Sequence, residues 1–173
     1  MQSGCGSWLD VSWPEEECVG DILAWDVCVV DGDGIGANAG GHWGRDVVQL
    51  RGAVARLQSD GLNVIIVSGG DLRTFASDGS GIDPKRSKQV WTQNDVALEV
   101  VKLAFEYRCR FISNADATKL ARRWDLPHLP REWLRRSLPV CQARFEFDAD
   151  GRFHVDLRSM SRKPVAAAVA PSG

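Results

Sequence analysis

The stretch Val27-Cys28-Val29-Val30-Asp31-Gly32-Asp33-Gly34 decides the fold that we expect for this chain. Its first four residues are apolar without polar alternation, which is typical of a strand in the middle of a parallel sheet. Two aspartates then alternate with two glycines, which allow the backbone to turn sharply. Because ligands of open α/β sheets bind where such strands end, we expect a site at Asp31 and Asp33. A simple Asp-Gly turn is the alternative that remains open at this point.

A strand, a helix and a second strand follow one another in this part of the chain. We place the first strand at about residues 25–30, and a glycine-rich loop at 32–44. From Asp46 onward, apolar residues recur at three- and four-residue spacing, which predicts a helix with one buried face that ends at Gly61. These residues are Val47, Leu50, Val54 and Leu57. The apolar run at 62–67 predicts a second buried strand, and the three elements together predict a right-handed βαβ unit.

Further elements are expected along the rest of the chain. The polar segment 71–89 is predicted to be a long loop, which in a compact domain is usually functional or disordered. We then expect a helix at about 95–107, a short strand at 111–113, a helix containing Lys119 and Arg123, a loop and short helix up to 137, and closing strands at 138–147 and 152–157 joined by a hairpin turn at 148–151.

Length and composition indicate one α/β domain. The 173 residues fit a flexible N-terminal arm (1–22), a single domain (23–158) and a disordered C-terminal tail (159–173). The net charge of −2 argues against a polybasic binder but does not exclude an RNA-binding enzyme with a local basic face. Five widely spaced cysteines without a Cys-x-x-Cys pair favour reduced thiols in an intracellular protein, cytoplasmic or nuclear. No run approaches the ~20 apolar residues that span a membrane, so no membrane partner is expected.

Acidic and amide side chains gather where the expected strands end and where one helix begins. The set comprises Asp31, Asp33, Asn94, Asp95, Glu99, Asn114 and Asp116. Carboxylates that converge in this way repel one another unless a divalent cation neutralises them, so the pattern predicts a Mg²⁺ site, with Mn²⁺ as the alternative ion. Basic residues able to hold a polyanionic backbone are Arg45, Arg51, Lys85, Arg86 and Lys88.

Several motifs, taken in order, resemble the NYN/PIN-like ribonuclease domain of Regnase-type CCCH zinc-finger proteins over roughly residues 27–157. Val29-Val30-Asp31-Gly32 is similar to the opening strand and Asp-Gly-Ser-Asn motif of that family, and His42 followed by Arg51-Gly52 matches a His…Arg-Gly pair at its spacing. Residues 101–106 (Val-Lys-Leu-Ala-Phe-Glu) and 112–114 (Ile-Ser-Asn) resemble the helix and strand that carry the later acids of the family.

The resemblance implies a three-layer α/β/α fold with a mainly parallel sheet and a Mg²⁺-dependent endoribonuclease that cleaves single-stranded or loop RNA. It assigns the catalytic and metal-binding roles to Asp31, Asp95 and Asp116. Supporting roles fall to Asp33, Asn38, Asn94, Asn114 and Glu99. The expected partner is RNA, and the oligomeric state is left open, with a homodimer as one alternative.

The chain also departs from the family pattern, which keeps two other functions open. Gly34 stands where the family has asparagine, although Asn38 could replace it, and Ala115 stands where it has aspartate, with Asp116 displaced by one residue. A displacement by one residue turns a side chain by about 100° around a helix. A degenerate PIN-like module that binds RNA or a protein without cutting is therefore one alternative. The other is a haloacid-dehalogenase-type phosphatase, because Asp31-Gly32-Asp33-Gly34 is similar to an Asp-x-Asp nucleophile loop.

Overall fold

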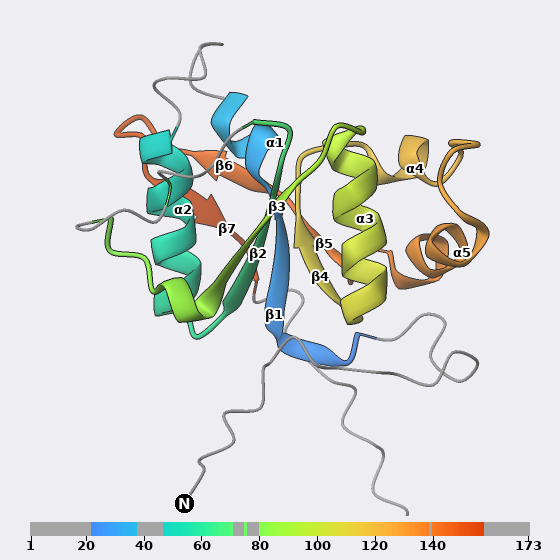
Figure 1. The fold of residues 1–173 in the computed structure, drawn as a ribbon, viewed down its shortest axis with the longest axis horizontal. Coiled ribbons are helices and arrows are strands. Elements are labelled where there is room, and N and C mark those ends of the chain that lie inside the picture. Colours follow the sequence, from blue (N-terminus) through green and yellow to red (C-terminus); the bar gives the residue numbers. More distant parts are fainter. Residues whose placement is uncertain (1–21, 38–46, 71–74, 76–79, 139, 158–173) are drawn as a thin grey trace, which may run out of the picture.

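A five-stranded parallel sheet runs through the centre of the molecule in the computed structural model, which describes residues 22–37, 47–70, 75, 80–138 and 140–157 (Figure 1). The strand order is β3-β2-β1-β4-β5. The strands are β1 (Ala24–Asp31), β2 (Asn63–Ser68), β3 (Ser87–Trp91), β4 (Cys109–Ile112) and β5 (Gln142–Ala143). The expected α/β class with a mainly parallel sheet is confirmed.

Both faces of the sheet are covered, which gives the expected three layers (Figure 1). One side carries α2 (Val47–Ser59) and the antiparallel hairpin of β6 (Phe145–Phe147) and β7 (Phe153–Val155). The other side carries α3 (Val96–Tyr107), α4 (Ala117–Leu120) and α5 (His128–Ser137). Val29 and Val30 are both fully buried but belong to opposite core clusters, because successive side chains of a strand face opposite ways.

The strand order determines where the candidate site lies in the fold. From β1 the chain builds outward through β2 to β3, and then returns to the other side of β1 to form β4. The direction of winding therefore reverses between β1 and β4, and ligands of such sheets bind at this switch point, beyond the carboxyl ends of the strands. At that edge β1 ends at Asp31, β2 at Ser68 and β3 at Trp91.

Two predicted loops are wrong in part. Within 71–89, residues Pro84–Arg86 form a 3₁₀ turn and residues 87–89 begin β3, which continues to Trp91. Strand β3 lies at the edge of the sheet and none of its residues is fully buried, so it has no apolar run to mark it. Within 32–44, Gly32–Ala37 form the short helix α1 directly after β1. The amide of Gly34 donates to Oδ1 of Asp31 over 2.7 Å, so this aspartate acts like a helix N-cap.

The closing segment also differs from the prediction of one strand at 138–147. Residues Gln142 and Ala143 join the sheet beside β4, and Phe145–Phe147 leave it to pair with β7. The predicted hairpin turn at 148–151 is confirmed, and Gly151 adopts a φ of 75° there. The helices predicted at about 46–60 and 95–107 are confirmed as α2 and α3.

Cys28, Cys109 and Cys141 are free thiols buried in the core, in agreement with the expected reduced state. Over the described ranges, none of the helices has the length and apolar character needed to cross a bilayer. Nearly all of the expected arm and tail, residues 1–21 and 158–173, lies outside the described residues.

Candidate acidic site at the carboxyl edge of the sheet

An open cleft of about 670 Å³ lies at the carboxyl edge of the sheet. It is lined by Asp31, Asp33, Gly34, Gly69, Trp91, Thr92, Gln93, Asn94, Asp95, Val96 and Ala97. Three of the predicted acids, Asp31, Asp33 and Asp95, thus meet at one cleft, together with the predicted Asn94. They come from the end of β1, the first turn of α1 and the start of α3.

Asp31 is the most enclosed of these acids, with 7 % of its surface exposed. Its Oδ1 accepts from the Gly34 amide, and its Oδ2 accepts from the hydroxyl of Ser113 over 2.7 Å. Burial raises the pKa of Asp31, and the negative charges of Asp33 and Asp95 raise it further, while the two hydrogen bonds act in the opposite direction. The two hydrogen bonds fix the carboxylate in place, and a nearby cation would relieve its repulsion by Asp33 and Asp95.

Close packing explains the two glycines after Asp31. A Cβ atom on Gly34 would lie 2.6 Å from Oδ2 of Asp31, and one on Gly32 would lie 2.9 Å from the carbonyl oxygen of Val67. Real Cβ atoms essentially never come so close. Gly34, which stands in the asparagine position of the family pattern, thus leaves room for the Asp31 carboxylate.

Asp33 is held from the neighbouring strand β2. Its Oδ1 accepts from the hydroxyl of Ser68 over 2.7 Å, and the Gly69 amide lies 3.2 Å from each of its oxygens. Ser68 and Ser113 are almost fully buried and each directly follows the apolar part of a strand. The sequence reasoning missed both hydroxyls, although their position at strand ends was a usable signal.

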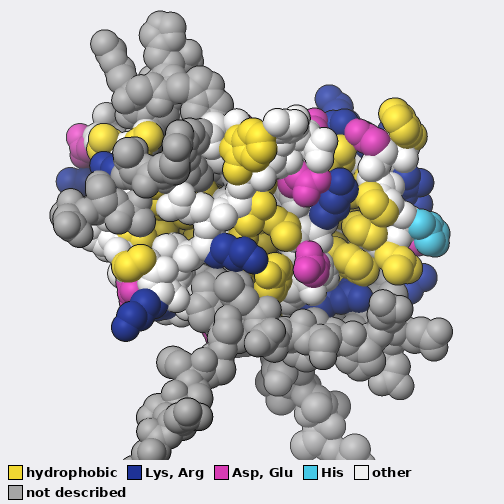
Figure 2. Space-filling model, viewed as in Figure 1, with side chains coloured by type: hydrophobic (Ala, Val, Ile, Leu, Met, Phe, Trp, Pro, Cys, Tyr) yellow, Lys and Arg dark blue, Asp and Glu magenta, His cyan; other side chains and the backbone are white. Residues whose placement is uncertain are grey.

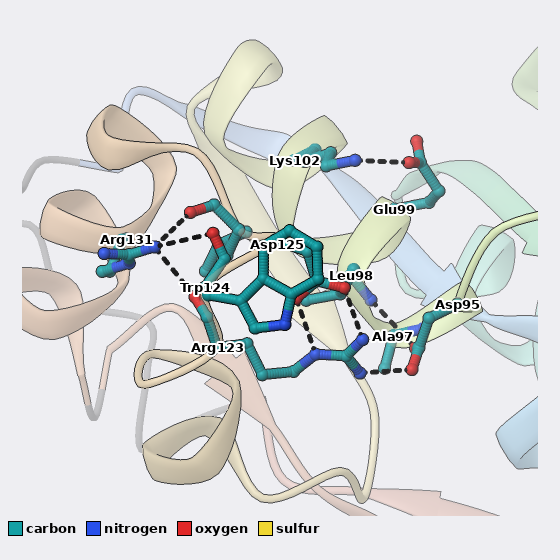
Figure 3. Close-up of polar contacts among 10 residues, drawn as sticks. Asp95, Ala97, Leu98, Glu99, Lys102, Arg123, Trp124, Asp125 and Arg131 are labelled. Atoms are coloured by element: carbon teal, nitrogen blue, oxygen red, sulfur yellow. Dashed lines mark hydrogen bonds and ion pairs between the residues drawn. The ribbon is translucent and has the colours of Figure 1, made fainter.

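Asp95 faces the cleft but already has partners for both oxygens. It caps α3, because Oδ1 accepts from the amides of Ala97 (3.0 Å) and Leu98 (3.3 Å). Its Oδ2 pairs with the guanidinium of Arg123, which Asp125 holds from the other side through two further bonds (Figure 3). The hydrogen bonds that Arg123 donates to Asp125 and then to Asp95 raise its pKa, so this side chain stays cationic.

The other predicted acids and amides that the structure describes are not among the residues that line the cleft. Asp116 caps α4, since Oδ1 accepts from the amides of Thr118 (3.0 Å) and Lys119 (3.2 Å). Asn114 makes two bonds to the backbone of Phe145, at 2.9 and 3.0 Å, and so ties the end of β4 to β6. Glu99 pairs with Lys102 at 2.7 Å. Asn38 lies outside the described residues.

Most of the predicted basic residues lie away from the cleft. Lys85 and Arg86 precede β3, at the amino edge of the parallel sheet, whereas the acids lie at the carboxyl edge. Arg86 donates to the carbonyl oxygens of Gln58 (3.0 Å) and Leu62 (2.9 Å), so it fastens the turn before β2.

Two more of these basic residues have partners elsewhere in the fold. Lys88 donates to the Tyr107 hydroxyl, which lies at the end of α3 (3.3 Å). Arg51 donates to the carbonyl oxygen of Phe75 (2.8 Å). Arg45 lies outside the described residues.

The donor set is suited to a hard cation. Within the described ranges, no group of three or more His, Cys, Asp or Glu side chains is already arranged around one point as a metal site. Mg²⁺, however, usually keeps several waters and is held by one or two carboxylates together with substrate phosphates. The fixed carboxylates of Asp31 and Asp33 fit that pattern, and Asp95 would join them once its oxygen leaves Arg123.

Comparison of the sequence with models of known protein families and with curated proteins gives no match.

Proposed function

We propose that this protein is a Mg²⁺-dependent endoribonuclease that cleaves single-stranded or loop RNA at the acidic cleft. The observation that carries the proposal is the meeting of Asp31, Asp33 and Asp95 at the switch point of a parallel sheet. The motif order described from the sequence supports the same reaction. We assign the metal to these three aspartates, with Mn²⁺ as the alternative ion. Asp116 does not line the cleft, and its role as a metal ligand remains a prediction from the sequence.

The residues of the chain prepare the cleft for this chemistry. A bound Mg²⁺ would orient the phosphodiester and lower the pKa of a water that attacks it. Asp31 and Asp33 are each fixed by a hydroxyl and a backbone amide, so their oxygens need little rearrangement. Burial and then the negative charges of Asp33 and Asp95 raise the pKa of Asp31, and the repulsion among these carboxylates would favour a cation beside them.

A second candidate, an RNA-binding module that does not cut, is favoured by one observation. The Arg123 guanidinium already pairs with Asp95, so a cation from the chain lies beside the acids. If this pair stays closed when RNA binds, the cleft keeps only Asp31 and Asp33. The phosphatase alternative gains no support, because no lysine that could hold a phosphate beside an aspartyl nucleophile is among the described residues that line the cleft.

The test is cleavage of an end-labelled stem-loop RNA with Mg²⁺, with EDTA, and with the variant Asp31→Asn. We expect cleavage only with the metal, and a loss of about 100-fold in the variant. Asp26→Asn is the matched control, because Asp26 is exposed on the same strand at its other end, and it should cleave normally. Cleavage that persists in EDTA, or that Asp31→Asn leaves unchanged, would refute the proposal. Tight RNA binding without any product would favour the second candidate.

A further inference from the structure

Trp91 is an exposed aromatic side chain on the wall of the acidic cleft. It is the last residue of β3, lines the cleft with the three aspartates, and is 60 % exposed. Tryptophan is usually largely buried, as Trp133 is here, because its ring carries a large apolar surface. What distinguishes Trp91 from other exposed aromatic side chains is its place: it lines the cleft beside the aspartates, where a ligand of the cleft would meet the ring.

The indole is held in a fixed position relative to the acids. Its Nε1 donates to the carbonyl oxygen of Gly69 over 3.1 Å, and the amide of the same glycine donates to Asp33. A Cβ on Gly69 would lie 3.1 Å from Oδ2 of Asp33, so this link is closely packed. Because the ring nitrogen is already bonded, the part of the ring that remains exposed is hydrocarbon.

We propose that Trp91 is a stacking platform for an unpaired base of the RNA strand that enters the acidic cleft. The inference rests on the proposed function and specifies its substrate: one nucleotide places its base on Trp91 and its phosphate towards the aspartates. Stacking on an aromatic face accepts any base, so the cleft selects for unpaired nucleotides and not for sequence. Bases within a duplex are stacked on their neighbours and cannot reach such a platform.

The distribution of charge supports a role for stacking. On the face shown in Figure 2, the basic side chains of the described residues are scattered among acidic and hydrophobic ones and do not form one patch. Arg86 and Lys88, which the sequence suggested for backbone contacts, bond to other parts of the fold. The described residues of this face thus offer no basic patch for the phosphates, so a base contact would gain importance for affinity.

Trp124 offers a matched control. It is even more exposed, at 91 %, but it is not among the residues that line the cleft. It follows Arg123 in the turn after α4, and its backbone carbonyl accepts from Arg131 (Figure 3). Truncation of Trp124 removes a similar exposed aromatic surface without touching the wall of the cleft.

The experiment measures the Kd of short labelled oligonucleotides by fluorescence anisotropy with Mg²⁺ present, so that the cation neutralises the aspartates, and with phosphorothioate linkages that resist cleavage. For single-stranded RNA, we expect Trp91→Ala to weaken binding by about tenfold. We expect Trp91→Phe to retain most of the affinity, and Trp124→Ala to match the wild type. A single-stranded DNA of the same sequence should lose the same factor in Trp91→Ala, because a stacked ring does not sense the 2′-hydroxyl. A duplex should bind weakly and without dependence on Trp91.

Wild-type affinity in Trp91→Ala, or equal losses in Trp91→Ala and Trp124→Ala, would overturn the inference. Photo-crosslinking of the wild-type protein to a 5-bromouridine RNA is a second test that needs no variant: we expect the crosslink at Trp91, and crosslinks confined to other peptides would overturn it. The two proposals fail separately. Binding that depends on Trp91 without cleavage refutes the nuclease alone, and Mg²⁺-dependent cleavage with normal affinity in Trp91→Ala refutes the platform alone.

Discussion

Four of the predicted acids form two halves, a strand-end half and a helix-cap half, that differ in how their carboxylates are held. Asp31 ends β1 and Asp33 lies in the first turn of α1 directly after this strand end, and each is fixed by a serine hydroxyl and a backbone amide from the surrounding strands and turns. Asp95 and Asp116 are exposed, and each caps the helix that follows it. The first half is built by the sheet around the cleft, whereas the second half consists of side chains that already stabilise helices. An acid that stands at the expected place in the sequence is thus not necessarily available to bind a metal ion.

The strongest test of the strand-end half is Gly34→Ala. The new Cβ would displace the Asp31 carboxylate, because it would lie 2.6 Å from Oδ2. Displacements on the ångström scale in catalytic groups cost about 100-fold in rate, and we expect a loss of that order in kcat/KM for RNA cleavage.

Gly52→Ala is the control for this variant, because a Cβ at Gly52 on α2 meets nothing within 4 Å. It should leave cleavage unchanged and stabilise the helix by about 0.5–1 kcal/mol. A Gly34→Ala protein that cleaves like the wild type would show that the position of Asp31 is not critical.

The pair Asp95→Asn and Asp116→Asn separates the two members of the helix-cap half. Both variants should stay folded, because asparagine caps helices as well as aspartate does. We expect Asp95→Asn to lower kcat/KM by about tenfold, as Asp95 lines the cleft, and Asp116→Asn to have no measurable effect. A comparable loss in both would place Asp116 in the site after all and would favour the original assignment from the sequence.

A smaller effect is expected from Arg123→Gln, which releases Oδ2 of Asp95. Because the Asp95–Arg123 pair is partly exposed and such pairs are weak, the Mg²⁺ concentration that gives half-maximal cleavage should fall by only about two- to fivefold. Its exposed neighbour Arg122 provides the control variant Arg122→Gln. If Arg123→Gln instead abolishes cleavage at saturating Mg²⁺, the guanidinium is a substrate contact and not a competitor of the metal.

The smallest effect concerns stability and pH. The pKa of Asp31 in the fold is raised above its ordinary value of 3.8. The contribution of this group to the free energy of unfolding is therefore present below pH 3.8 and is lost as the pH rises through the raised pKa. Without metal, Asp31→Asn should therefore melt at a somewhat higher temperature than the wild type at neutral pH, and the difference should vanish in acid. Thermal unfolding across this range checks it; a variant that is less stable at neutral pH contradicts it.

Much of the fold could be predicted because the central elements carry strong apolar patterns. The runs at β1 and β2 and the periodic faces of α2 and α3 correspond to residues that are buried in the structure. Strand β3 could not be found in this way, since edge strands expose most of their side chains and Ser87–Trp91 has only one aliphatic residue. The helix α1 was missed because four of the first five residues from Gly32 are glycine or aspartate, which usually indicate a turn.

Only part of the site could be predicted, and the reason is again physical. Asp31 and Asp33 follow directly from the apolar strand before them. The contact between Asp95 and Arg123 joins residues 28 positions apart, and no local pattern predicts that a cation will lie there. Trp91 could not be predicted as a site residue, because the edge strand that carries it has no apolar run to mark it.

The hydrogen bond from Ser113 to Asp31 has a consequence for the order of events during folding. It joins residues 82 positions apart, and the serine follows β4, which docks against β1 on the far side from β2. Pairing of β1 with β2 closes a much shorter stretch of chain, and such short loops form faster than long ones. A nascent chain that has formed only this first unit has the aspartate but lacks the hydroxyl that positions it. We therefore expect the acidic cleft to be completed late, and binding of the proposed cation would report on the arrival of β4 in refolding experiments.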